Sequence, residues 1–376
     1  MFKLLKAVSI FVGTVIGAGI FGIPYVINKS GIIPGFFYFL ILGGVVLLIH
    51  LFFGEVFLRT KESCRLPGLA QKYLGAWGKI LVMISVVVGL TGALLAYLIL
   101  SGDFLRILFS PFSSLSAVQL AMIFWVLMSY LIFRGIKIIA SIELLTNIIF
   151  FSTSAVVLFF CLSRFNLQNL AAFNLSNAFL PFGVILFSLI GWSAIPEIVD
   201  FFKTSPEKKK LKKTMILATA VTVPFYLIFT LAILGVTGGN ISQDTLSSLA
   251  PFLSPKVIFL AVLAALVTLA DSILVLGLYL KNTFVCDLRL SNGSATAIAC
   301  GVPFLLFLIG FRDFIGTIGF VGTVVGVIEG TAIILIFRRA KKLGNRQPEY
   351  SFKIPSLLLY LLIAILVLGA VSQFLL

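Results

Sequence analysis

The sequence predicts an all-α integral membrane protein with about eleven transmembrane helices, and three observations support this prediction. Of its 376 residues, 60% are hydrophobic and only 11% are charged, far from the balance of a water-soluble domain. Apolar runs of about 20 residues, long enough to cross a bilayer core, recur from end to end. Two of these runs are interrupted by Gly and Pro at corresponding positions in the two halves of the chain.

The apolar runs define the spans in chain order. A spanning β-barrel would instead show segments of about 10 residues in which apolar and polar residues alternate, and the sequence has none. The first run is too long and too rich in Gly for a signal peptide, so we expect a retained first helix. The predicted spans are 5–27, 32–58, 79–101, 117–134, 138–163, 180–201, 214–236, 256–281, 295–311, 314–337 and 354–375.

The basic residues indicate how the chain is oriented. A net charge of +15 would suggest a nucleic-acid partner in a soluble chain, but here Lys and Arg lie between apolar spans, and we expect no such partner. We expect a cell-membrane protein. If its N-terminus lies in the cytoplasm, most of the Lys and Arg residues fall on the inner side and the C-terminus lies outside. The cations left on the outer side are Lys29, Arg106, Arg164, Lys256 and Arg312.

Two spans contain residues that a continuous helix would not favour. The first carries the Gly-rich stretch Gly13–Pro24, and the sixth carries Gly191–Glu197 with its Pro. Close helix packing is an alternative reading, because Gly13 and Gly17 form a GxxxG pair. The correspondence between the two interruptions favours broken helices in a five-plus-five inverted repeat, since an odd number of spans per half inverts the second half.

The repeat also predicts the organisation of the chain. We expect residues 1–376 to form one transmembrane domain, with a first repeat at 5–163, a second repeat of nearly equal length at 180–337 and an additional C-terminal helix at 354–375. Paired interruptions in inverted halves are the best sequence indication of a transporter's binding site.

A helix broken at the bilayer midplane exposes backbone N–H and C=O groups that need partners. A zwitterionic amino acid supplies both kinds, with its carboxylate on the N–H groups and its ammonium on the carbonyls. Trp192 and the third span are expected to contact the amino acid side chain. The predicted substrate-binding residues are Ile16, Gly17, Ala18, Gly19, Ile20, Thr91, Tyr97, Ser188, Ile190, Gly191, Trp192 and Ser193.

Three stretches resemble the amino acid/auxin permease family of the amino acid-polyamine-organocation superfamily. They are Gly13–Pro24, Ala96–Leu105 and Gly191–Glu197 with the basic loop that follows. A fourth stretch, Asp271–Leu278, is similar to the eighth helix of the hydroxy and aromatic amino acid permeases, the close competitor. The resemblance covers the first ten spans and implies the five-plus-five fold with alternating access. Asp271 departs from it, because these relatives more often carry a hydroxyl residue there.

Asp271 is the strongest candidate for coupling transport to an ion. It lies near the middle of the eighth span beside Ser272 and one turn after Thr268, and a charge at that depth costs about 2.5–3.5 kcal/mol. These oxygens could form a cage for Na⁺ or a protonatable site, with a proton preferred. The alternative is an Asp hydrogen-bonded for packing alone. Glu197 and Glu329 are further ion-coupling candidates.

The remaining ionisable groups and the cysteines receive structural interpretations. Glu55 and Glu143 lie near the expected cytoplasmic ends of their spans, where a solvated or Arg-paired carboxylate is favoured. His50 could relay protons, although a lone His satisfied by a neighbouring backbone group is at least as common. Glu197 follows Pro196 in a first turn, where its charge also suits the helix dipole. The 4 Cys residues lack metal or disulfide spacing.

These features together predict a secondary active amino acid transporter, a H⁺ or Na⁺ symporter working by alternating access, with no cofactor and no catalysed chemistry. An intramembrane enzyme acting on a lipid-linked substrate is the first alternative, but the chain has one His and lacks a close His/Asp/Cys group. A channel is the second alternative, for which rings of charge along a continuous pore would be expected.

Overall fold

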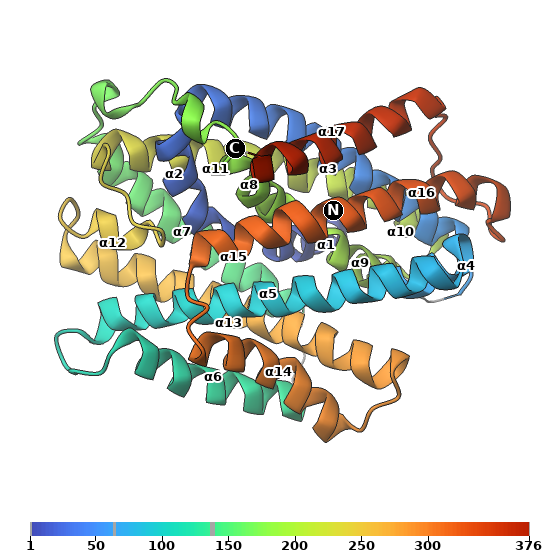
Figure 1. The fold of residues 1–376 in the computed structure, drawn as a ribbon, viewed down its shortest axis with the longest axis horizontal. Helices are drawn as coiled ribbons and strands as arrows, with labels where there is room; N and C mark the ends of the chain where they lie inside the picture. Colours follow the sequence, from blue (N-terminus) through green and yellow to red (C-terminus); the bar gives the residue numbers. More distant parts are fainter. Residues whose placement is uncertain (1, 63–64, 136–139, 376) are drawn as a thin grey trace.

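The chain folds into a bundle of long helices that lie side by side along the longest axis of the molecule (Figure 1). The structure, a computed structural model, describes residues 2–62, 65–135 and 140–375. Within these residues, 9 helices are long and apolar enough to cross a membrane, and a bent pair forms a further span. The shorter apolar helix Asn292–Leu308 corresponds to the predicted span 295–311. The all-α membrane fold predicted from the sequence is therefore confirmed.

The first half of the chain contains the predicted first five spans and one extra helix. Lys137 and the first residues of the predicted span 138–163 lie outside the described residues. The helices are α1 (Phe2–Val15), α2 (Gly19–Ser30), α3 (Ile32–Arg59), α4 (Leu66–Leu74), α5 (Ala76–Phe109), α6 (Ala117–Arg134) and α7 (Ala140–Leu162).

The second half begins after two short 3₁₀ turns, η1 (Leu167–Asn169) and η2 (Leu175–Asn177). It includes a π-helical turn, η4, in the tenth span. Its elements are α8 (Pro181–Leu189), η3 (Trp192–Ala194), α9 (Ile195–Phe201), α10 (Ser205–Lys208), α11 (Lys210–Thr237), α12 (Leu246–Leu249), α13 (Pro255–Asp287), α14 (Asn292–Leu308), α15 (Phe314–Phe320), η4 (Val321–Gly326), α16 (Val327–Leu343) and α17 (Ser356–Leu375).

Both predicted helix interruptions are present. The first span breaks after Val15 and resumes at Gly19, and α1 and α2 meet at a bend of 53°. The sixth span breaks after Leu189 and passes through the 3₁₀ turn η3 before α9 begins. Pro196 is tolerated because it lies in the first turn of α9, where its missing N–H would have had no helical partner.

Glycine brings the sixth and tenth spans into close contact. A Cβ on Gly322 of η4 would lie 1.8 Å from the carbonyl oxygen of Gly183 in α8, so any side chain there would force the two helices apart. Gln373 of α17 joins the same contact, because its side-chain oxygen accepts from the Gly183 N–H at 3.1 Å. π-helical turns occur frequently at functional sites, and this one lies next to the interrupted sixth span.

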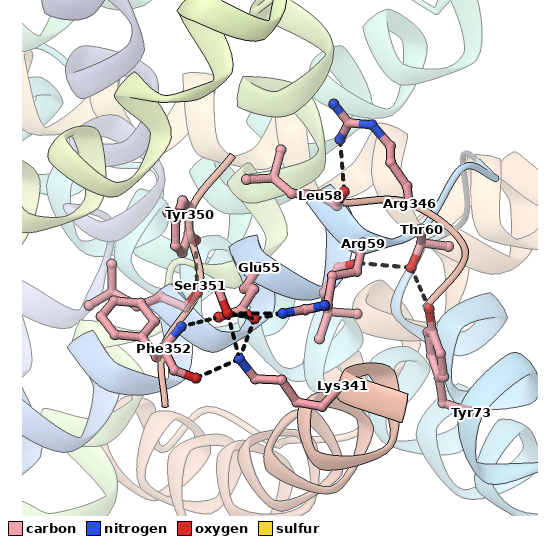
Figure 2. A network of polar contacts seen from close by, with 12 residues as sticks. Glu55, Leu58, Arg59, Thr60, Tyr73, Lys341, Arg346, Tyr350, Ser351 and Phe352 are labelled. Atoms are coloured by element: carbon pink, nitrogen blue, oxygen red, sulfur yellow. Dashed lines mark hydrogen bonds and ion pairs between the residues drawn. The ribbon is translucent and has the colours of Figure 1, made fainter. Parts of the chain in front are cut away.

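A buried polar cluster fastens the segment between α16 and α17 to the end of α3 (Figure 2). The Glu55 side chain is fully buried and accepts from Arg59 Nε at 2.7 Å and Lys341 Nζ at 2.5 Å. Its other oxygen accepts from the Phe352 N–H at 2.8 Å. We call these four residues the Glu55 cluster. The Arg-paired interpretation of Glu55 is confirmed, and Lys341 is an additional partner.

Candidate substrate cavity and cation site

A cavity of about 100 Å³ lies against both broken helices. Because one water needs roughly 10–15 Å³ of such space, the cavity has room for several waters or a small solute. Most of its lining is apolar, and polar residues from both broken spans also line it. The lining residues are Thr14, Val15, Gly17, Gly19, Phe53, Leu66, Val86, Gly89, Leu90, Ala93, Tyr97, Phe187, Ile190, Trp192, Ser193, Pro196, Leu276, Tyr279, Val321, Val325 and Glu329.

The structure brings half of the predicted substrate-binding residues to this cavity. Those lining it are Gly17, Gly19, Tyr97, Ile190, Trp192 and Ser193. The other six are buried and do not line it: Ile16, Ala18, Ile20, Thr91, Ser188 and Gly191.

The two breaks pack against each other reciprocally. At the start of α2, a Cβ on Gly19 would lie 2.1 Å from Ser188 Oγ, at the end of α8. At the break in the sixth span, a Cβ on Gly191 would lie 2.5 Å from Val15, the last residue of α1. Each half-helix start thus touches the end of the other broken helix. This places backbone N–H donors and carbonyl acceptors from both spans around one point.

Tyr226 of α11 links the carbonyl ends of both broken helices. Its hydroxyl lies 2.8 Å from the Val15 carbonyl oxygen and 3.1 Å from that of Ser188. Because a phenol carries one proton, it serves these two acceptors jointly and leaves lone-pair capacity for another donor. Sequence reasoning missed Tyr226, since a tyrosine in an apolar span gives no sign of which helix it faces.

His50 of α3 satisfies the break in the sixth span. Its Nε2 accepts from the Gly191 N–H at 3.1 Å, which puts the proton of a neutral imidazole on Nδ1. His50 is buried and packs edge-on against Phe11, with ring centroids 4.9 Å apart. The backbone contact that the structural interpretation expected is present, with an N–H rather than a carbonyl as the partner, but Nδ1 is buried without a partner among the described residues.

The N–H groups at the start of α2 are available to a ligand. Among the described residues, neither Gly19 nor Ile20 donates its backbone N–H to a protein acceptor. The Tyr97 hydroxyl lies beside the Ala18 N–H and the Ser272 hydroxyl. Gly19 lines the cavity, so its unused N–H at a helix start is suited to a carboxylate.

Glu329 and Trp192 form a polar pair in the cavity wall. The Trp192 indole Nε1 donates to Glu329 Oε2 at 2.6 Å, and both side chains are buried. This contact joins the sixth span to the tenth. A partner for Glu329 could not be predicted from the sequence, because the two residues belong to different spans.

A second, smaller cavity surrounds Asp271. It measures about 10 Å³, roughly the space of one water. Asp271 is 8% exposed, and its Oδ1 has no hydrogen-bond partner among the described residues. A buried carboxylate oxygen with this free capacity is suited to holding a proton or a cation. The cavity is lined by Gly13, Thr14, Tyr97, Glu143, Asp271, Ser272, Val275 and Leu276.

Glu143 belongs to this second cavity, so the solvated or Arg-paired interpretation of that residue is wrong. Its side chain is only 8% exposed, because α7 packs against α1 and α13 and turns the carboxylate inward. The ion-coupling candidates Thr268, Glu197 and Glu329 do not line this cavity. Thr268 donates to the Ala264 carbonyl of its own helix at 3.0 Å, Glu197 is exposed in the first turn of α9, and Glu329 lines the larger cavity.

A helical bundle with two broken spans beside a shared cavity is typical of a membrane transporter. The profile of the tryptophan/tyrosine permease family matches residues 1–373, and the chain belongs to that family. The match selects the competitor that Asp271–Leu278 indicated, the hydroxy and aromatic amino acid permeases. It does not show the amino acid/auxin permease branch, which the sequence analysis put first.

Individual relatives agree with this assignment. Tyrosine-specific transport system 2 of Haemophilus influenzae is 28% identical over 251 residues, which are 64% of this chain and 59% of that protein. Glutamine transporter 2 of Aliivibrio fischeri is 23% identical over 338 residues, covering 86% of this chain and 85% of that protein. The structure of MhsT in complex with L-phenylalanine shares the fold, with a TM-score of 0.71, 14% identity and coverage of 99% and 98%.

Proposed function

We propose that this protein is a secondary active transporter of aromatic amino acids. The observation that supports it most is the reciprocal contact of the two helix breaks beside the larger cavity, with unused N–H groups at Gly19 and Ile20. An α-amino acid is the simplest solute that carries an anion for such donors and a cation for the carbonyl ends joined by Tyr226.

The lining of the cavity favours an aromatic side chain. Beyond the breaks, its walls are formed by apolar groups such as Phe187, Leu90 and Val325. Aromatic rings bury a large apolar area and pack well against such walls. The name of the Haemophilus influenzae relative, a tyrosine-specific transport system, agrees with this substrate class.

The cavity extends toward the end of the bundle that holds most of the Lys and Arg residues. Its lining includes Phe53 near the end of α3 and Leu66 in α4. By the positive-inside rule, this end faces the cytoplasm, and the protein lies in the cell membrane with its N-terminus inside and its C-terminus outside. The structure would then represent a state that receives or releases substrate at the cytoplasmic side.

Contacts on the opposite side of the breaks close the path to the exterior. The Thr245 hydroxyl, next to α12, donates to the Phe21 carbonyl of α2, and the Phe21 and Phe104 rings meet edge-on with centroids 5.0 Å apart. Alternating access would require these contacts to open as the cytoplasmic side closes. The proposed inverted repeats, 5–163 and 180–337, supply the symmetry for that exchange.

We further propose that the smaller cavity couples transport to a cation. Two buried carboxylates, Asp271 and Glu143, face a space beside the first span, and their repulsion would be relieved by a shared proton or a bound Na⁺. The Tyr97 hydroxyl lines both cavities and so lies between the cation and the substrate. We favour a proton, because two carboxylates can exchange one without other ligands.

Counterflow in proteoliposomes tests the proposed function. Vesicles loaded with unlabelled tyrosine should take up external labelled tyrosine transiently above its equilibrium level, because a carrier exchanges substrate across the membrane. Protein-free vesicles are the control. Uptake that is not stimulated by internal tyrosine would indicate a channel, and conversion of a lipid-linked substrate without amino acid movement would indicate the enzyme alternative.

A further inference from the structure

We propose that Glu329 determines substrate specificity by accepting a hydrogen bond from the far end of the substrate side chain. The group it would recognise is a phenol hydroxyl or an indole N–H. This inference rests on the proposed function, since it assigns a role within the same cavity. It replaces the ion-coupling role that the sequence suggested for this residue.

The first support is the unfinished bonding of the Glu329 carboxylate. The side chain lines the larger cavity and is only 7% exposed. Among the described residues, only Oε2 accepts a hydrogen bond, from Trp192 Nε1 at 2.6 Å. An ionised carboxylate offers about four lone-pair sites on two oxygens, so Oε1 retains capacity for a donor from a ligand. Because the Glu329 side chain lines the cavity, a donor on a bound substrate can reach this oxygen.

The second support is that Glu329 does not line the cation site. Glu329 lines the larger cavity and is absent from the lining of the smaller one, which contains Asp271 and Glu143. It is the third residue of α16, which directly follows η4, whereas the cation site lies among α1, α5, α7 and α13. A carboxylate that shares its cavity with substrate, and not with the other carboxylates, is better suited to recognising substrate.

The third support is the apolar wall next to Glu329. Val321 and Val325 of η4 line the cavity, and each packs against a glycine of α5. A Cβ on Gly89 would lie 2.6 Å from Val325, and one on Gly92 would lie 2.4 Å from Val321. These contacts bring α5 close to η4 and leave an apolar wall that leads to a single carboxylate. A ring with one donor at its far end matches such a surface.

The pair tyrosine and phenylalanine isolates the proposed hydrogen bond, because the two differ by one hydroxyl. A site built to hydrogen-bond a substrate hydroxyl can reject the analogue that lacks it by as much as roughly 10⁴-fold. The cavity also admits water, which can satisfy Oε1 when phenylalanine is bound. We therefore expect a smaller preference for tyrosine, about 100-fold in apparent affinity.

The experiment measures apparent affinities for tyrosine and phenylalanine by counterflow with purified wild type, Glu329→Gln and Glu329→Leu. Glu62→Gln, a change in an exposed ion pair outside the cavity, is the matched control. Wild type and control should prefer tyrosine by about 100-fold, and Glu329→Leu should reduce that ratio to within about 5-fold. Glu329→Gln should give an intermediate ratio, because one of its two terminal groups is an NH₂ that donates and cannot accept from Trp192 or the substrate.

Three results would overturn the inference: wild type that does not distinguish tyrosine from phenylalanine, a ratio unchanged in both Glu329 variants, or transport of lysine or arginine in preference to both aromatic substrates. If Glu329→Leu does not fold, Glu329→Gln decides, because it preserves the shape of the side chain. Failure of the proposed function is distinguishable, because then wild type would show no counterflow with any amino acid.

Discussion

Single side chains provide hydrogen-bond partners at the two helix breaks that the glycines allow to pack together. Gly19 and Gly191 allow the broken spans to touch, and Tyr226 and His50 then provide partners for the backbone groups that the breaks expose. In hydrocarbon an unpaired backbone group costs several kcal/mol, so such partners are needed for the breaks to persist. The binding geometry therefore depends on side chains that contribute no atom to the cavity wall.

Tyr226→Phe should destabilise the protein and weaken substrate binding. The change removes the only proton shared by the Val15 and Ser188 carbonyls and leaves both buried without that donor. We expect a loss of about 1–3 kcal/mol in the free energy of unfolding, measured by thermal unfolding in detergent. Tyr130→Phe is the control, because Tyr130 is 54% exposed. Equal stability of the two variants would argue against the bridge.

Asp271→Asn and Glu143→Gln should each abolish gradient-driven accumulation of substrate while counterflow continues, because counterflow needs no net movement of the coupling cation. The two carboxylates share one cavity, so the double variant should be no worse than either single one. Accumulation is measured in proteoliposomes with an imposed pH or Na⁺ gradient, applied separately. Wild-type accumulation with unaltered cation dependence in both variants would dismiss the proposed cation site.

The sequence predicted these residues unevenly, and the reason is geometric. The depth of Asp271 in its span and the Gly and Pro residues of the breaks can be read from the sequence alone. The partnerships of Tyr226, His50 and Glu143 depend on how each helix is rotated about its axis. An almost wholly apolar span has no polar face to reveal that rotation, so these partnerships could not be predicted.

At the scale of elements, each break divides its span into two half-helices. The first span bends by 53°, whereas the sixth passes through a 3₁₀ turn, so the two interruptions differ in detail although they occupy corresponding positions. The tenth span contains a π-helical turn instead of a break, and the close approach of Gly322 to Gly183 holds it against the sixth span. The substrate cavity is thus enclosed by irregular segments of three spans.

Gly19→Ala should separate the two broken spans. Its Cβ would meet the Ser188 side chain at 2.1 Å and the Ser188 Cα at 2.9 Å, so backbone must move, at a cost of roughly 1–3 kcal/mol. We expect substrate affinity in counterflow to fall at least about 10-fold. Gly44→Ala in α3 is the control, because nothing lies within 4 Å of its added Cβ. An unchanged affinity in Gly19→Ala would count against contact between substrate and this break.

Hydrophobic runs predicted the existence of the spans well and their ends less well. The predicted third span, 79–101, is the helix Ala76–Phe109, because helical hydrogen bonding continues past the apolar core into polar residues such as Asp103 and Arg106. The short helix α4 was not predicted at all. It lies in a basic loop, and its packing against α5 and α16 is a tertiary contact that hydropathy does not report.

At the scale of the molecule, the Glu55 cluster connects helices that belong to different proposed repeats. It ties the end of α3 to the end of α16 and to the segment before α17 (Figure 2). Glu329 and η4 lie on the same tenth span as Lys341, so any movement of α3 would be transmitted toward the substrate cavity. We expect α3 and the end of α16 that carries Lys341 to move together during transport.

Glu55→Gln should destabilise the fold more than any exposed charge change. Removing one partner of a buried ion pair costs about 3–5 kcal/mol, and we expect the lower end, because Arg59 and Lys341 retain some exposure. Glu62→Gln, which breaks the exposed pair with Lys72, is the control and should change the unfolding temperature little. If both variants unfold at the same temperature, the Glu55 cluster does not fasten the helices.

The proposed transport requires one amino acid to bind between the two broken helices, so the position of bound substrate is the most direct test. An experimental structure of the purified protein with 3-bromotyrosine would locate the ligand by its bromine atom. We expect the carboxylate against the Gly19 N–H, and the ring beside Val321 and Val325, with its hydroxyl toward Glu329. Saturating ligand bound outside this cavity, or an empty cavity under those conditions, would contradict it.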